Sequence, residues 1–182
     1  MKIFLLFLSL LIIQRVSELL LARRNERIVR DMGAFEHDGK GYRTIVLMHA
    51  AFFVSLGAEY FLLHRTLNAY WLPLITLFLI AQALRYWAIA SLGKFWNTKI
   101  LVVPGAQAVM KGPYRYLKHP NYIAVTIEIA AIPLLFSCYI TCVLFSVLNL
   151  IALRRRIRIE ESALYGARPG GGHGAPPSSA AG

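Results

Sequence analysis

The chain has 182 residues, of which 57% are apolar and only 16% are charged, and its formal net charge is +11. The mean hydropathy is +0.54 and the apolar residues come in long blocks, which excludes an ordinary soluble domain. The positive charge does not indicate nucleic-acid binding, because basic residues also flank membrane helices on the cytoplasmic side. We therefore expect an all-α integral membrane protein with no nucleic-acid partner.

Three apolar segments come first, at about residues 3–22, 44–63 and 70–92. Each has roughly 20 residues, enough to cross a hydrocarbon core of about 30 Å. The first is not expected to be a cleaved signal peptide, because the basic stretch RRNER follows it instead of a small-residue cleavage site.

The fourth apolar block, from Tyr122 to Leu153, is too long for one membrane crossing and short for two. Pro133 lies within it, and proline breaks or kinks a helix. The pattern predicts a tight helical hairpin divided at Pro133, which brings the total to about five transmembrane segments.

Basic residues are concentrated in three segments, at 23–43, 93–121 and 154–158. Five crossings place all three segments on the same side of the membrane, whereas the opposite loops carry little beyond Lys2 and Arg65. By the positive-inside rule, that side is the cytoplasm. The N-terminus is then expected outside and the C-terminus inside.

A single membrane-embedded domain is expected over residues 1–165, with three N-terminal helices in 1–92 and the functional half in 93–165. Residues 166–182 are rich in Gly, Pro, Ala and Ser and are expected to be disordered. Cys138 and Cys142 share one helix face within an apolar run and are interpreted as packing residues. Their spacing matches no redox or zinc motif, so no metal site is expected.

Six ionisable residues fall in or near the apolar segments: Arg15, Glu18, His49, Glu59, Arg85 and Glu128. Such residues are costly in lipid and usually face protein or water. One interpretation is mutual pairing, since Arg15 and Glu18 are three apart on one helix face. The other is a polar cavity that opens to the cytoplasm, because all but Glu59 lie in the expected cytoplasmic half.

Two segments combine the residue types that carry chemistry. KGPYRYLKHPNY, residues 111–122, ends a connection of nearly thirty residues, and connections of that length are usually functional or disordered. RIRIEESAL, residues 156–164, follows the predicted hairpin, and its Arg156 and Glu160 share a helix face. On their own these two residues are equally consistent with a surface ion pair.

Together the two segments resemble the isoprenylcysteine carboxyl methyltransferase family of integral membrane enzymes. The family pattern is G-x-Y-x-x-x-(R/K)-H-P-x-Y, then a helical hairpin, then R-x-x-x-E-E-x-x-L. Here the pattern reads Gly112, Tyr114, Lys118, His119, Pro120 and Tyr122, followed by Arg156, Glu160, Glu161 and Leu164. The resemblance covers about residues 92–164. Family members commonly continue with an aromatic, acidic segment, whereas here the Gly/Pro/Ala tail follows Tyr165.

The resemblance implies a cytoplasmic pocket that binds S-adenosyl-L-methionine. The residues implied to line it are Ala106, Gln107, Ala108, Val109, Tyr114, His119, Pro120, Asn121, Tyr122 and Glu160. Arg156 is implied to face the methyl acceptor as the catalytic residue. Family members methylate prenylcysteine carboxylates, and small bacterial relatives methylate hydroxyls of alkylpyrone or alkylresorcinol lipids. The implied partner is therefore a lipophilic acceptor from the bilayer, and the implied location is a bacterial plasma membrane.

The residue types agree with methyl transfer from a sulfonium, an in-line displacement in which alignment provides much of the rate. Tyrosine faces stabilise a cation, and a carboxylate such as Glu160 can bind ribose hydroxyls or an ammonium group. An arginine such as Arg156 can hold a carboxylate by two hydrogen bonds. A carboxylate acceptor is ionised at pH 7 and requires no general base.

Three alternatives remain open from the sequence. A phospholipid N-methyltransferase resembles this family in its C-terminal half, but an amine acceptor must lose a proton and would require a base. An NADPH-dependent membrane reductase of the sterol-reductase type also resembles this region. The third alternative is a protein without catalytic activity, either a membrane scaffold or a methyltransferase relative disabled by its altered tail.

Overall fold

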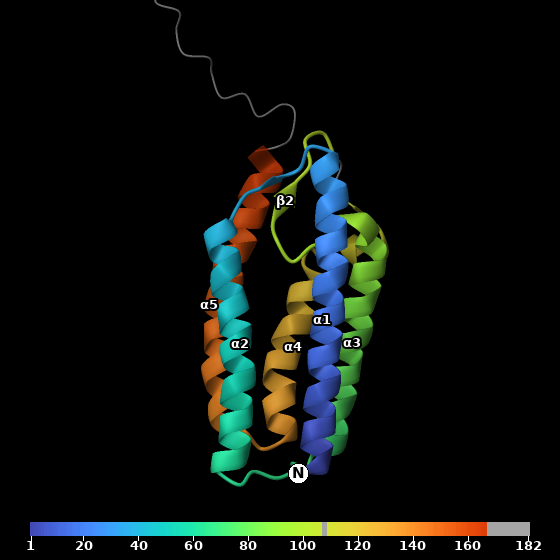
Figure 1. Ribbon diagram of the computed structural model, residues 1–182. Coiled ribbons are helices and arrows are strands. Elements are labelled where there is room, and N and C mark those ends of the chain that lie inside the picture. Colours follow the sequence, from blue (N-terminus) through green and yellow to red (C-terminus); the bar gives the residue numbers. More distant parts are fainter. Residues whose placement is uncertain (107–108, 167–182) are drawn as a thin grey trace, which may run out of the picture.

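The computed structural model describes residues 1–106 and 109–166, with the side chains of the last helix described as far as Ala163. The described residues form five α-helices, two 3₁₀ helices and two short strands (Figure 1). These are α1 (Lys2–Asp31), β1 (Phe35–Glu36), α2 (Gly39–Leu62), α3 (Trp71–Leu92), η1 (Gly93–Phe95), β2 (Leu101–Val102), η2 (Gly112–Arg115), α4 (Pro120–Leu135) and α5 (Tyr139–Gly166). Of the tail expected to be disordered, residues 167–182 lie outside the described part of the chain.

The helices run side by side, with α4 between α1 and α3 on one flank and α2 and α5 on the other (Figure 1). The closest packing is between α3 and α4, between α4 and α5, and between α2 and α5. Near the N-terminus an aromatic cluster fills the interior, where Phe4 stacks on Tyr60 with ring centroids 3.7 Å apart and Phe136 meets Phe4 edge-on. The bundle therefore has a firmly packed apolar end opposite the end that carries β1 and β2, which we call the site end.

The helices α1, α2 and α3 are long and apolar enough to cross a membrane, whereas α4 is a shorter apolar helix. Their outward surfaces carry exposed apolar side chains such as Leu6, Leu47 and Leu72. The protein is thus a mostly helical membrane protein. The helix α1 continues nine residues beyond its predicted apolar segment, through the basic stretch RRNER.

The predicted division at Pro133 is wrong in position. Pro133 lies inside α4, two residues before the helix ends, and the chain turns at residues 136–138. The Pro133 carbonyl accepts hydrogen bonds from the backbone N–H groups of Phe136 and Cys138, so the turn satisfies the helix end. Cys138 is buried at this turn and Cys142 is half-buried, and both are free thiols.

The expected all-α fold class agrees with the mostly helical structure, in which β1 and β2 add a small antiparallel sheet. Phe35 pairs with Val102 and Glu36 with Leu101, and the His37 N–H donates to the Ile100 carbonyl. Strands of two residues are too short to show an alternating pattern in the sequence. They pair because otherwise unpaired backbone groups in the long loop require partners.

Candidate functional site

The segment after α3 is fixed against the helices at the site end. The Asn25 side chain on α1 donates hydrogen bonds to the carbonyls of Gly93 and Trp96, at 3.1 and 2.8 Å. Further along, Ile100 and Val102 pack in an apolar cluster with Ala163 on α5. The loop between α3 and α4 is therefore clamped between the first and last helices.

Gly112 of the motif is required by a close approach to α3. Its backbone has φ of +55°, and a Cβ placed there would lie 1.9 Å from Ser91 Oγ and 2.9 Å from Trp87 Nε1. A residue with a side chain would have to displace α3 and would also adopt a strained backbone conformation. Gly112 thus lets η2 pack on α3 and fixes the position of the half-buried Tyr114 two residues later.

The central feature of the site end is a hydrogen-bonded chain that joins the two motif segments. Arg156 Nε donates to the Tyr122 hydroxyl at 2.7 Å, and that hydroxyl donates to Glu160 Oε2. Arg156 Nη2 also donates to the Thr98 carbonyl at 2.7 Å. The structure thus brings together α4, α5 and the loop before β2, although Tyr122 and Arg156 are 34 residues apart.

His119 lies at the position before α4 and faces the same carboxylates. Its ring stacks on Tyr122 with centroids 5.2 Å apart and an interplanar angle of 12°. Nε2 is 3.4 Å from Glu161 Oε1, and Nδ1 is 3.9 Å from Glu160 Oε2. We call Tyr122, Arg156, Glu160, Glu161 and His119 the site cluster.

Two further residues implied to bind the cofactor, Pro120 and Tyr114, lie next to this cluster. Pro120 is the buried first residue of α4. Burial, with a smaller contribution from the nearby Glu160 charge, raises the pKa of Tyr114 to about 12. Ala106 is exposed and Val109 half-buried. Gln107 and Ala108 lie outside the described residues.

Asn121 connects the motif to a second group of charges deeper in the bundle. Its Oδ1 lies 3.4 Å from Arg85 Nη1, and Arg85 Nε donates to Glu128 Oε1 at 2.8 Å. Arg15 donates to Glu128 at 2.5 Å and to Glu18 at 2.6 Å. We call Arg15, Glu18, Arg85 and Glu128 the membrane cluster. The mutual pairing considered from the sequence is thus present and extends across α1, α3 and α4.

Glu59 belongs to neither group and lies near the opposite end of α2. It accepts hydrogen bonds from the backbone N–H groups of Ile140 and Thr141, at 3.2 and 2.7 Å, and pairs with Arg65 at 3.1 Å. A carboxylate at the first turn of α5 satisfies N–H groups that have no partner within the helix. Glu59 is therefore explained by structure alone.

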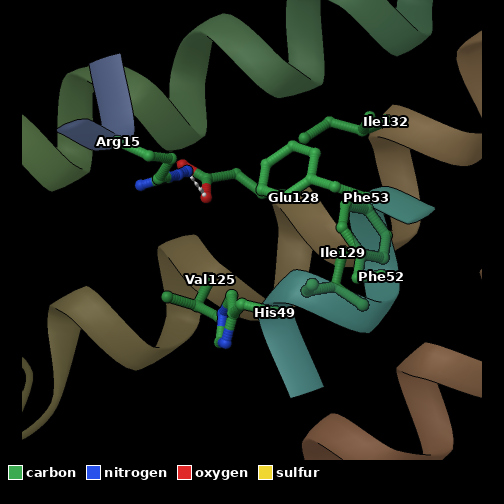
Figure 2. Close-up of a pocket in the computed structure, with 8 residues that line it drawn as sticks. All are labelled: Arg15, His49, Phe52, Phe53, Val125, Glu128, Ile129 and Ile132. Atoms are coloured by element: carbon green, nitrogen blue, oxygen red, sulfur yellow. Dashed lines mark hydrogen bonds and ion pairs between the residues drawn. The ribbon is translucent and has the colours of Figure 1, made fainter. Parts of the chain in front are cut away.

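Two cavities are found in the described part of the chain. One is between α1, α2 and α4 and is lined by Arg15, His49 and Glu128 together with apolar side chains (Figure 2). The other is an open groove next to β1, lined by Glu36, Gly39, Tyr42, Arg43 and Lys99. Residues of the site cluster line neither cavity.

The structure adds residues that the sequence reasoning missed. Thr98 contributes a backbone carbonyl, which no side-chain pattern can reveal. Next to it, both polar atoms of the Asn97 amide are buried and have no hydrogen-bond partner among the described residues. Asn25, which holds the loop, stood out only as a polar residue within the basic stretch after the first apolar segment.

The model of the isoprenylcysteine carboxyl methyltransferase (ICMT) family matches residues 74–166, which are 93 of the 182 residues. The chain belongs to this family. The match covers η2, α4 and α5 and therefore every residue of the site cluster, and it confirms the resemblance on which the sequence analysis relied. Membership indicates a membrane methyltransferase.

Two bacterial proteins are similar to this chain over most of its length. The uncharacterized protein YpbQ of Bacillus subtilis is 48% identical over 161 residues, which cover 88% of this chain and 96% of the relative. An uncharacterized protein of Haemophilus influenzae is 25% identical over 151 residues, covering 82% and 88%. No solved structure shows a significant match.

Proposed function

We propose that the protein is an S-adenosyl-L-methionine-dependent O-methyltransferase that acts on a carboxyl or acidic hydroxyl oxygen of a lipophilic acceptor from the bilayer. The observation that carries this proposal is the hydrogen-bonded chain from Arg156 through Tyr122 to Glu160. It joins the two segments of the family match into one polar surface at the end of the helices.

The residues present fit S-adenosyl-L-methionine, whose sulfonium supplies the methyl group. Glu160 and Glu161 provide negative charge for its ammonium group or ribose hydroxyls, and their side chains remain 30% and 36% exposed. Tyr122 and His119 also place aromatic rings beside these carboxylates, and an aromatic face can stabilise a cationic sulfur. The Asn97 amide, which has no hydrogen-bond partner among the described residues, supports the same assignment, because a buried polar group without a hydrogen bond is costly unless a bound molecule satisfies it.

Arg156 acts on the acceptor in this proposal. Nε and Nη2 are held by Tyr122 and the Thr98 carbonyl, which fixes the plane of the guanidinium. Within the described residues Nη1 makes no hydrogen bond, so this edge is free to bind an acceptor oxygen. A planar guanidinium held in this way orients an anionic oxygen better than a mobile ammonium would.

The proposed site faces the cytoplasm of a bacterial cell, with five membrane crossings. The support is the positive charge around the site end, which follows the positive-inside rule. Single cysteines replacing Arg27 or Lys111 are expected to react with an impermeant maleimide only from the cytoplasmic side, and a cysteine replacing Asn68 only from outside. Labelling of position 111 from outside would contradict this orientation.

Cofactor titration tests the proposed activity most directly. Purified protein in lipid nanodiscs is expected to bind S-adenosylhomocysteine at micromolar concentration by calorimetry. His119→Ala and Glu160→Gln should each weaken that affinity about tenfold, or 1.4 kcal/mol. Asp31→Asn, an exposed acid at the end of α1, is the matched control and should not. Binding of NADPH in its place would support the reductase alternative, and binding of neither would support a scaffold.

A further inference from the structure

The open groove next to β1 lies at the site end, where the chain connects α1 to α2 (Figure 1). Its volume is about 420 Å³, within the range of roughly 300–1,000 Å³ that is typical of small-molecule sites. The lining comes from β1, the first turns of α2 and the loop before β2, and consists of Glu36, Gly39, Tyr42, Arg43 and Lys99. The groove is thus mostly polar, and it is separate from the site cluster.

The charges around the groove leave Arg43 without a counter-ion. Lys99 Nζ lies 2.8 Å from Glu26 Oε1 and 3.4 Å from Glu36 Oε2. Arg30 Nη2 lies 2.7 and 3.2 Å from the same two oxygens, so these two cations and two carboxylates neutralise one another. The side chain of Arg43 is exposed and forms no ion pair or hydrogen bond with any described residue. The groove therefore carries a net positive charge that favours an anion.

The hydrogen-bond donors in the groove suit a phosphate group. The Lys99 ammonium lies 5.6 Å from the centroid of the Tyr42 ring, so Lys99 is held in place by this ring as well as by its two carboxylates. The Tyr42 hydroxyl has no hydrogen-bond partner among the described residues. A guanidinium fork, an ammonium and a hydroxyl together match the oxygens of a phosphate.

The position of Arg43 on α2 places its charge where the apolar part of the helix begins. Residues 44–58 contain no Asp, Glu, Lys or Arg. Val46, Leu47 and Val54 follow Arg43 by three, four and eleven residues, a spacing that keeps them on one helix face, and all three are exposed. We call these three residues the apolar stripe. It runs from the groove into the bilayer, so an anion bound at Arg43 can extend hydrocarbon chains along it.

We propose that the groove binds the phosphate headgroup of an anionic phospholipid, whose acyl chains lie against the apolar stripe. The lipid is held as a bound component and not as a methyl acceptor, so this site goes beyond the proposed function and does not depend on it. Basic pockets beside transmembrane helices are places where anionic headgroups bind. A free phosphate ion would use the same donors but would gain nothing from the apolar stripe.

Photo-crosslinking tests the location of the lipid. The probe is phosphatidylglycerol with a diazirine in one acyl chain, present as a minor component of phosphatidylcholine nanodiscs. We expect labelled peptides around Leu47 and Val54, suppressed by unlabelled phosphatidylglycerol but not by sodium phosphate. Arg43→Gln should reduce this labelling about tenfold, because a charge-assisted hydrogen bond is lost. The matched control, Arg24→Gln, removes an exposed charge from α1 and should label normally.

Two results of this experiment would overturn the proposal. Equal labelling in Arg43→Gln and Arg24→Gln would show that the groove does not select the lipid. Suppression by sodium phosphate would assign the groove to a free phosphate ion instead of a headgroup.

A second measurement uses the stability that a ligand confers on the folded state to which it binds. Phosphatidylglycerol added to the protein in an uncharged detergent is expected to raise the unfolding temperature of wild type and Arg24→Gln, but not of Arg43→Gln. Arg43→Lys keeps the charge but loses the planar fork, so its rise should be smaller than that of wild type. An equal rise in wild type and all three variants would show a general attraction to basic residues and would refute a specific site.

Discussion

The site cluster and the membrane cluster contain similar residues but differ in how completely their charges are satisfied. In the membrane cluster two arginines face two glutamates, and the side chains of Arg85 and Glu128 are only 5% and 4% exposed. In the site cluster the carboxylates are about one-third exposed and the neighbouring Asn97 amide has no partner among the described residues. The first arrangement ties α1, α3 and α4 together. The second leaves polar groups only partly satisfied within the described residues, which is what the proposed cofactor site requires.

The largest expected effect comes from breaking the membrane cluster. Glu128→Ala leaves Arg15 and Arg85, whose side chains are 21% and 5% exposed, with only the Glu18 carboxylate between them. We expect a loss of about 3–5 kcal/mol in the free energy of unfolding, measured by thermal or denaturant unfolding in mild detergent. The control is Arg155→Ala, which removes an exposed pair with Asp38 at 3.4 Å and should cost no more than about 1 kcal/mol. Equal stability of the two variants would show that the membrane cluster does not tie the helices together.

A smaller loss is expected at the glycine that brings the site to α3. Gly112→Ala forces a Cβ against Ser91 and should destabilise the protein by about 2 kcal/mol while also weakening cofactor binding. Adding Ser91→Ala removes the nearest atom and should recover part of both losses. If the double variant behaves as the sum of two independent defects, the close approach is not the cause.

Arg156→Lys in the site cluster is expected to change turnover with little change in the free energy of unfolding, unlike a change in the membrane cluster. Lysine keeps the charge but cannot bind Tyr122, the Thr98 carbonyl and an acceptor together, so methyl transfer should fall about tenfold while S-adenosylhomocysteine affinity stays near wild type. Turnover with radiolabelled S-adenosyl-L-methionine provides the measurement. Arg155→Lys, one residue away on an exposed face, should retain turnover. Near-wild-type methylation in both variants would show that Arg156 does not orient the acceptor. It would then contribute only as one of several positive charges that set the orientation of the protein in the membrane.

The smallest effect concerns Tyr114. Its pKa in the folded protein is about 12, above the value near 10 of an unfolded chain, so the folded state holds the proton more tightly. The resulting stability is fully present below pH 10 and is lost as the pH rises from 10 to 12. Unfolding measured across this range should show a decline in wild type that is reduced in Tyr114→Phe and unchanged in Tyr116→Phe, since Tyr116 is 76% exposed. The same decline in wild type and Tyr114→Phe would contradict this role.

The sequence predicted the features that depend on composition and on ordered motifs. The apolar blocks predicted helices close to α1, α2 and α3, and the order of the two motif segments identified the family. The division at Pro133 was misplaced because α4 continues two residues past this proline and ends at Leu135, where the N–H groups of residues 136–138 satisfy the carbonyls of Pro133 and Leu134 at the helix end. The pairing of β1 and β2 was missed because two residues carry no periodic signal.

Contacts between residues far apart in the chain could not be predicted from a single sequence. The sequence spacing suggested the pair Arg15–Glu18, three residues apart, but not Arg85–Glu128, which are 43 residues apart. The hydrogen bond from Arg156 to Thr98 uses a backbone carbonyl, and the cavity beside His49 forms only where three helices meet. Each of these features follows from how the helices pack together, which local propensity does not determine.

The pairing of β1 with β2 has a consequence for how the protein is made. On the proposed topology β1 emerges on the cytoplasmic side and waits there while α2 and α3 enter the membrane, because its partner lies about 65 residues later in the chain. At about 5–20 residues per second of synthesis, this interval is about 3–13 s. Thr98 is made just before this partner, and the turns of α5 that bear Arg156 follow later still. Assembly of the site is therefore one of the last events of biogenesis, and a ribosome that stalls after α3 would leave a membrane-inserted chain with no means of holding a cofactor.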